Sequence, residues 1–189
     1  SDFQSDNQFN LLFQYRRTWL NRLGGEWLTE VQIGQDAHLF SEFFQPLHEA
    51  GRWFVAPHFE IGERSRGVFA GDDKLADYRV RFGQVGFDGG AVLGTWGHVR
   101  LGPVWSRIDA SVDTGSPLLP SAEETSAGMR AALFVDQTDR AFFPAHGFAA
   151  AASAYAAMES FGSAVSYRRL EGLVRAARSW GPHTFYASA

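Results

Sequence analysis

The sequence predicts an all-β fold, and more narrowly an antiparallel up-and-down transmembrane β-barrel. Apolar and polar residues alternate with a period of two along most of the chain, which indicates strands that have one apolar face. Glycine and aromatic residues are both abundant, with 20 Gly and 15% Phe, Trp and Tyr among 189 residues, as is typical of strands joined by turns. Tryptophans gather beside the turns predicted for one side, as in the aromatic girdle of a membrane barrel.

The composition excludes several classes of function. The chain carries 17 basic and 21 acidic side chains, for a net charge of −4, so no nucleic-acid partner is expected. Cysteine is absent, which excludes disulfides, thiolate metal sites and thiol nucleophiles. No segment reaches the roughly 18 apolar residues of a membrane-spanning helix. We expect one domain over residues 1–189, which either is soluble or crosses a membrane as strands.

The predicted strands follow one another along the chain. In the clearest of them Trp53, Val55 and Phe59 share one face, while His58 and Glu60 lie on the other. The segment 148–158 is rich in alanine, which favours a helix, but its alternate residues also form a continuous apolar face and we predict a strand. With turn residues between the segments, we predict about ten strands, the best defined at residues 9–15, 27–33, 52–61, 104–112, 129–135 and 148–158.

The loops of a membrane barrel must obey a parity rule, because long loops lie on one side and short turns on the other. Two long polar stretches, Gly62–Asp77 and Thr114–Glu124, are predicted loops. They fall on the same side only if residues 91–112 form one strand, with a bulge at Gly102-Pro103 that shifts the alternation by one residue. The short turns of the opposite rim are then predicted at residues 21–25, 48–51, 88–90, 137–145 and 179–182.

This predicted barrel assigns one face of each strand to lipid and the other face to the lumen. The predicted lipid-facing and girdle residues are Trp19, Trp27, Trp53, Val55, Phe59 and Trp180. The polar faces carry charges of both signs and would line the lumen, and the predicted lumen residues are Glu30, Glu60, Arg79, Arg81, Arg107, Asp109 and Arg130. The same alternation also fits a soluble sheet with one buried and one wet face, so that alternative stays open.

Patterns that would carry catalysis or metal binding are missing from the sequence. A Gly-x-Ser-x-Gly nucleophile motif does not occur, and the six histidines have no ligand spacing. The acidic pairs Asp72-Asp73 and Glu123-Glu124 are typical of solvated loops. Gly24-Gly25 and Gly89-Gly90 precede strands, which indicates hairpin turns and not phosphate loops. We expect no catalytic residue, cofactor or metal site in this chain.

One turn has a more specific pattern. Asp136 and Asp139 are followed by Pro144 and Gly147, directly before a predicted strand. Aspartate side chains cap turns, proline fixes the following bend, and glycine permits a close backbone approach. An ordinary long hairpin connection explains these residues as well.

Several segments resemble a known group of barrels. Val135–Gly147 resembles the D-x-x-D…P-x-x-G turn that precedes a strand in the bacterial surface-antigen superfamily, which includes outer-membrane assembly factors. Tyr15–Trp27 and Phe43–Pro57 resemble the barrel of patatin-like phospholipase autotransporters, and Leu93–Gly102 fits the same family. The resemblance extends from about Tyr15 to Gly147.

The resemblance implies a location and a function. In that family a patatin-type lipase precedes a periplasmic polypeptide-transport-associated module and a C-terminal barrel of sixteen strands. We therefore expect a barrel in the bacterial outer membrane that anchors, exports or presents an attached lipase. The motifs of the lipase Ser–Asp dyad are absent, so no catalytic residue is carried over and the chain itself is not expected to be an enzyme.

Two features depart from the family pattern. Ten strands are fewer than sixteen, and residues 183–189 lack the terminal aromatic residue of an outer-membrane insertion signal. We therefore expect part of a larger barrel, closed by further residues or by another chain, because open sheet edges are not tolerated in lipid. The implied partners are membrane lipid, the attached lipase and transport-associated domains, the barrel assembly machinery and, as an option, a second copy of the chain. The alternatives are the barrel of a related assembly or secretion factor, a diffusion porin, and a soluble all-β binding module.

Overall fold

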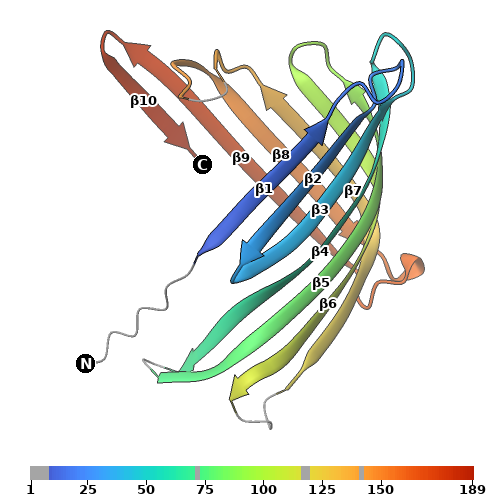
Figure 1. Ribbon diagram of the computed structural model, residues 1–189, viewed down its shortest axis with the longest axis vertical. Coiled ribbons are helices and arrows are strands. Elements are labelled where there is room, and N and C mark those ends of the chain that lie inside the picture. The colour runs from blue at the N-terminus through green and yellow to red at the C-terminus, as the bar shows by residue number, and fades with distance from the viewer. Residues whose placement is uncertain (1–8, 71–72, 116–119, 141–142) are drawn as a thin grey trace.

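The chain is all-β, and its described residues form ten antiparallel strands in one sheet that follow one another in chain order (Figure 1). The computed structural model describes residues 9–70, 73–115, 120–140 and 143–189. The strands are β1 (Asn10–Arg17), β2 (Glu26–Gly34), β3 (Asp36–Pro46), β4 (Trp53–Ala70), β5 (Asp73–Val92), β6 (Gly97–Gly115), β7 (Ala122–Asp136), β8 (His146–Ala157), β9 (Tyr167–Trp180) and β10 (His183–Ser188). One short 3-10 helix, η1 (Glu159–Phe161), joins β8 to β9. The alanine-rich segment forms β8, as predicted. Within the described ranges, no helix has the length and apolar character to cross a membrane.

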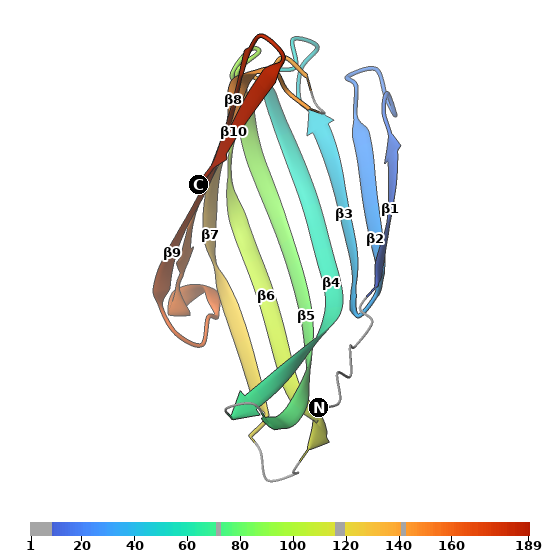
Figure 2. The same ribbon diagram turned by 90° about the vertical axis from the view of Figure 1, so that its left-hand side faces the viewer.

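The sheet is a single layer that curves into a trough, and Figure 2 looks into its open side. β1 and β10 form the two edges, and no pairing joins them in the described part of the chain. The molecule exposes 13395 Å², whereas a compact soluble protein of this mass exposes roughly 9,000 Å². The excess arises because neither face of the sheet is covered by a second layer of described strands, so the fold is not a sandwich.

Small residues on the concave side allow the sheet to curve tightly across β4–β7. A Cβ atom at Gly86 would clash with the His58 ring, and one at Gly90 would clash with the Phe54 ring and lie 2.5 Å from the Val99 carbonyl oxygen. Glycine at such positions lets neighbouring backbones and large rings approach closely. The space is filled by Phe54, which is 1% exposed.

The parity of the connections is confirmed. The turns at residues 18–25, 47–52, 93–96 and 181–182, together with the described residues 137–140 and 143–145, lie at one end of the sheet, the upper end in Figure 1, which we call the short-turn end. β4 and β6 both finish at the opposite end, which we call the far end. The polar stretches predicted as loops are, in their described residues, mainly extensions of strands. β4 continues to Ala70 and β6 to Gly115, since cross-strand ion pairs support their polar residues.

Two predicted details of β5 and β6 are wrong. The turn expected at residues 88–90 does not form there, because β5 continues to Val92 and residues 93–96 make the turn. The bulge expected at Gly102-Pro103 is also missing. Leu101 pairs with Gly89 and Val104 with Gly86, so three residues separate the two pairs on each strand and the register is unbroken. The register shifts instead between Val68 and Phe69 and between Asp77 and Tyr78.

Candidate functional site

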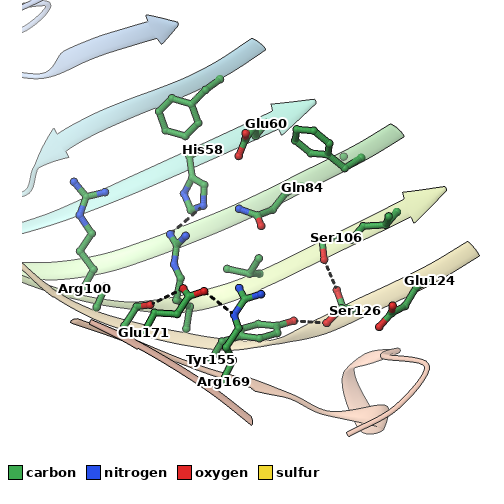
Figure 3. Close-up of a pocket in the computed structure, with 18 of the residues that line it drawn as sticks. His58, Glu60, Gln84, Arg100, Ser106, Glu124, Ser126, Tyr155, Arg169 and Glu171 are labelled. Atoms are coloured by element: carbon green, nitrogen blue, oxygen red, sulfur yellow. Dashed lines mark hydrogen bonds and ion pairs between the residues drawn. The ribbon is translucent and has the colours of Figure 1, made fainter. Parts of the chain in front are cut away.

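The two faces of the sheet have different chemistry. The concave face lines a cavity of about 810 Å³ that receives side chains from β3 to β9 (Figure 3). Even-numbered residues point into it from β3–β7, such as Glu42, His58 and Arg130, and odd-numbered residues point into it from β8 and β9, such as Tyr155 and Glu171. The remaining alternate residues lie on the convex face, because cross-strand partners share a face.

A network of charges crosses the concave face near the short-turn end, and each strand from β3 to β7 contributes one member. The members of this concave charge network are Glu42, His58, Asp88, Arg100 and Arg130. Arg130 Nη2 donates to Asp88 Oδ2 at 2.7 Å, and Arg100 Nη1 donates to Glu42 Oε2 at 2.5 Å. Arg100 Nη1 also lies 3.9 Å from Asp88 Oδ2. The network therefore ties together strands that are not neighbours in the sheet.

Burial makes the pairing of these charges obligatory. The Asp88 side chain is 0% exposed and the His58 side chain 2% exposed, and an unpaired charge at such a position would be costly. His58 Nδ1 lies 3.2 Å from the Ala56 carbonyl oxygen, and Arg130 Nη2 lies 3.2 Å from His58 Nε2. The geometry fits a neutral ring whose Nδ1–H donates to the carbonyl while Nε2 accepts from Arg130.

Aromatic rings cover the network toward the short-turn end. Phe54 packs against Phe44 and His98 with ring centroids 4.6 Å and 6.0 Å away, and His98 stacks on Phe134 at 4.8 Å. The Arg100 guanidinium lies 5.5 Å from the centre of the Phe54 ring and 6.0 Å from that of Phe134. The rings thus shield the ion pairs from water, which strengthens them.

A second polar group lies farther along the cavity. Ser126 Oγ lies 2.8 Å from the Tyr155 hydroxyl and 3.0 Å from the Tyr167 hydroxyl. Arg169 lies over the Tyr155 ring at 5.8 Å and pairs with Glu171 at 3.3 Å, and Figure 3 shows these side chains side by side. The described side-chain partners of Ser126 are hydroxyl groups, so this group can supply hydrogen bonds to the cavity.

No metal centre is formed by the described residues, among which no three His, Asp or Glu side chains are placed to hold an ion. Glu123 instead pairs with Arg107 at 2.5 Å. Asp72, one of the acidic residues noted in the sequence, lies outside the described ranges.

The convex face carries a continuous apolar belt. Phe59, Val85 and Trp105 are register partners in one row of it. On β4 the belt runs from Trp53 to Ile61, a span of roughly 20 Å for tilted strands, near the ~25 Å apolar band of a membrane barrel. Large side chains of the belt that are between 40% and 81% exposed include Phe59, Ile61, Val85, Phe87, Leu101, Trp105, Leu133, Phe148, Leu170 and Val174.

Toward the far end of the sheet, the apolar belt ends within one row of residues. The row after Ile61 is charged on β4–β7, where its members are Glu63, Arg81, Asp109 and Glu123 in register order, and Ala37 continues it on β3. Arg81 Nε lies 3.0 Å from Glu63 Oε2, and Arg79 Nη2 lies 2.6 Å from Asp113 Oδ1. These ion pairs mark the polar boundary of the belt.

Tryptophans mark its other boundary. Trp27, Trp53 and Trp180 lie in strand residues next to the short turns, and Trp19 lies within the first turn. Trp96 joins them because the β5–β6 connection lies at residues 93–96 and not at the predicted position. Trp105 lies within the belt, in the row of Phe59 and Val85. Five of the six tryptophans in the chain therefore lie at the short-turn end.

The structure places the predicted lipid-facing and lumen residues as follows. Val55 and Phe59 lie on the convex face, and Glu30, Glu60 and Arg130 lie on the concave face. Four of the predicted lumen residues lie on the opposite, convex face, and this corrects the prediction for Arg79, Arg81, Arg107 and Asp109.

The correction has two physical causes. For Arg107 and Asp109, the unbroken register of β6 keeps odd-numbered residues on the convex side, whereas the predicted bulge would have turned them inward. For Arg79 and Arg81, the polarity of the side chain does not indicate the face of the sheet, because both residues lie beyond the apolar belt. There a convex side chain no longer needs to be apolar, and Val80 takes the concave position.

Three of the four residues singled out in the sequence, Asp136, Asp139 and Gly147, have a defined role in the turn between β7 and β8. Asp136 Oδ1 accepts from the Thr138 backbone nitrogen at 3.0 Å, and Asp139 Oδ1 accepts from those of Ala145 and His146 at 2.9 and 3.1 Å. These hydrogen bonds lower the pKa of the Asp139 carboxyl, and the one from the His146 backbone nitrogen has the largest effect.

The other two residues of the pattern lie where the turn meets β8. Pro144 lies between strands β7 and β8. Gly147 has φ 110°, and a Cβ there would clash with the Gln137 carbonyl oxygen.

Sequence reasoning missed most of the concave charge network. Of its five members only Arg130 was predicted as a lumen residue. Asp88 was assigned to a turn because Asp-Gly-Gly is a common turn sequence. The available signal was the alternation itself, which places Ala56, His58 and Glu60 opposite the apolar face of β4 and leaves a buried histidine in need of partners.

Among the comparisons with known proteins, the one with solved structures supports the architecture. No family model matches the chain, and a search of curated proteins gives no match. Among solved structures it is similar to the crystal structure of BamA from Haemophilus ducreyi lacking POTRA domains 1-3, with a TM-score of 0.69 and 10% sequence identity. The similarity covers 89% of this chain and 34% of the BamA chain. At this identity the comparison establishes the fold, which is an up-and-down antiparallel sheet that matches part of a BamA barrel.

Proposed function

We propose that this chain forms part of a bacterial outer-membrane β-barrel whose convex face contacts lipid. The observation that carries the proposal is the exposed apolar belt, bounded on one side by a row that is charged across β4–β7 and on the other side by tryptophans. A water-soluble protein rarely exposes such a continuous apolar surface. The soluble binding module is disfavoured for the same reason, since its apolar face would have to be buried in a second layer.

The open sheet edges support a larger assembly. β1 and β10 each have one unpaired side within the described residues, and unpaired backbone groups are not tolerated in lipid. The chain spans 34% of the BamA chain that it matches. We propose that further strands, to a total of sixteen, close the barrel around the concave charge network.

The barrel would anchor and present an attached patatin-like lipase. This finer proposal rests on the resemblance of Tyr15–Trp27, Phe43–Pro57 and the Asp136–Gly147 turn to the barrels of patatin-like autotransporters. The lipase and a periplasmic transport-associated module would lie outside this chain, and the barrel assembly machinery would insert it. A barrel of a related assembly or secretion factor is the second candidate, and the structural similarity to BamA favours it.

Expression of the full reading frame in a bacterium separates these functions. The lipid-facing proposal predicts that the protein sediments with outer membranes and needs detergent for extraction. The anchor predicts that intact cells hydrolyse an added fluorogenic phospholipid, and that this activity is lost when the serine of an upstream Gly-x-Ser-x-Gly motif is changed to alanine. An assembly factor would show no lipase activity, and its depletion would lower the amounts of other outer-membrane barrels. A monodisperse protein in buffer without detergent would contradict the membrane proposal.

A further inference from the structure

Arginine accompanies tryptophan three times at the short-turn boundary of the belt. Arg17 is the register partner of Trp27, the Arg52 guanidinium lies 5.9 Å from the centre of the Trp53 ring, and the Arg178 guanidinium lies 4.8 Å from the centre of the Trp180 ring. These pairs come from β1–β2, from the start of β4 and from the end of β9. We call them the arginine–tryptophan collar.

The collar arginines are available to a ligand. All three are exposed, and within the described residues none forms an ion pair with Asp or Glu. The arginines at the charged boundary on β5 and β6 differ, because Arg79, Arg81 and Arg107 are each paired with a carboxylate. The collar therefore presents unneutralised positive charge where the apolar belt ends.

We propose that the collar binds the phosphate groups of anionic glycerophospholipids, an inference that rests on the proposed membrane location. A guanidinium matches a phosphate in a bidentate geometry, and a tryptophan ring prefers the head-group depth of a bilayer. In the Arg52–Trp53 and Arg178–Trp180 pairs the ring holds the guanidinium by a cation–π contact at the edge of the belt, and in the third pair the two side chains are cross-strand neighbours. Each pair thus combines an apolar anchor with a phosphate ligand, and their repetition around the rim selects anionic over zwitterionic lipid.

Quenching by brominated lipids provides the test, because bromine quenches only tryptophans that are close to the lipid, and five of the six tryptophans of this chain lie at the short-turn end. The full-length protein is inserted into vesicles of phosphatidylcholine that contain brominated phosphatidylglycerol or, separately, brominated phosphatidylcholine. We expect the relative association constant to favour phosphatidylglycerol by about fivefold per engaged arginine. The preference should fall to near one in the triple variant Arg17→Gln, Arg52→Gln, Arg178→Gln, and it should weaken in salt.

Two matched variants with one substitution each keep the test valid if the triple variant fails to insert. Arg178→Gln removes a collar charge from the convex side of β9. Arg175→Gln removes the same charge three residues away, where the side chain faces the cavity side with Ala149 and Leu173. Only Arg178→Gln should reduce the preference.

The outcomes separate this inference from the proposed function. Equal quenching by both lipids in the unmodified protein would contradict the proposal that the collar binds anionic lipid, but it would leave the proposed membrane location unaffected. An equal loss of preference in Arg175→Gln and Arg178→Gln would also overturn it, because the effect would then be one of net charge. No quenching by either lipid would remove the proposed membrane location itself.

Discussion

Arg130 of β7 donates a 2.7 Å hydrogen bond to Asp88 of β5 across the intervening strand β6. The path is open because Gly102 of β6 has no side chain: it pairs with Arg130, and a Cβ there would lie 2.8 Å from Asp88 Cα. A glycine on a strand interior thus permits an ion pair between strands that are not neighbours. This ion pair is part of the concave charge network, which links side chains from β3 to β7.

Removal of the buried carboxylate should be strongly destabilising. Asp88→Ala leaves Arg130 and Arg100 without their shared partner, and breaking a buried pair on one side costs about 3–5 kcal/mol. A urea titration of the protein refolded in detergent or lipid measures the free energy of unfolding. The control Asp109→Ala removes an acidic residue from the charged boundary of the convex face and should change the stability by no more than about 0.5 kcal/mol. Equal effects of the two changes would show that the network contributes no special stability.

Glycines of the two faces should respond differently to an added methyl group. Gly102→Ala would place Cβ against the Phe87 carbonyl oxygen and obstruct the Arg130–Asp88 contact, so we expect a loss of about 1–3 kcal/mol. Gly89→Ala is the control, since the nearest atom to its Cβ, the Leu101 carbonyl oxygen, is 3.9 Å away. The same unfolding titration should find Gly89→Ala neutral or slightly stabilising. A Gly102→Ala variant as stable as the parent would refute the close approach of β5 and β6.

The two faces of β4 should also differ in their tolerance of charge. Val55→Arg places a guanidinium on the convex belt one row from the Trp53 boundary and should cost about 1–3 kcal/mol, between the values for the interface and for mid-membrane. Glu60 lies on the concave face and has no ion pair with a described residue, so Glu60→Gln should have little effect. Unfolding in lipid vesicles compares the two variants. Small and equal losses would contradict the assignment of the faces.

The β7–β8 turn should be sensitive to acid. The lowered pKa of Asp139 means that the unfolded chain binds a proton there more readily than the folded one. Its stabilising contribution is therefore complete above the unfolded value of about 3.9 and is lost as the pH falls through the lower folded value. NMR should show the backbone N–H signals of Ala145 and His146 shifting together in that lower range. In Asp139→Asn this titration should disappear, and its persistence would assign it to another group.

The local features of the fold were accessible from the sequence. Period-two alternation is a property of each strand by itself, so it predicted ten strands and the correct parity of their connections. The helix–strand ambiguity of the alanine-rich segment was resolved correctly because Phe148 and the alternate alanines form one apolar face. The turn at Asp136–Gly147 could be predicted because its capping bonds join residues close in sequence.

Features that depend on distant residues were not accessible. Asp-Gly-Gly at 88–90 fits a turn and a tightly packed strand equally well, and only the presence of Phe54 beside Gly90 decides between them. Arg100 meets Glu42, 58 residues away in sequence, and Arg130 meets Asp88, 42 residues away. Alternation places each of these side chains on a face but does not identify its partner.

The central claim is that lipid contacts the convex face, and spin labels on two adjacent residues test it most directly. This chain has no cysteine, so Phe59→Cys and Glu60→Cys each give one defined nitroxide site on β4, on the convex and the concave face respectively. In lipid vesicles, the label at position 59 should collide frequently with dissolved oxygen and rarely with a water-soluble nickel chelate, and the label at position 60 should show the reverse preference. Equal access of the nickel chelate to both labels, or protection of position 59 from both reagents as in a packed interior, would contradict the account.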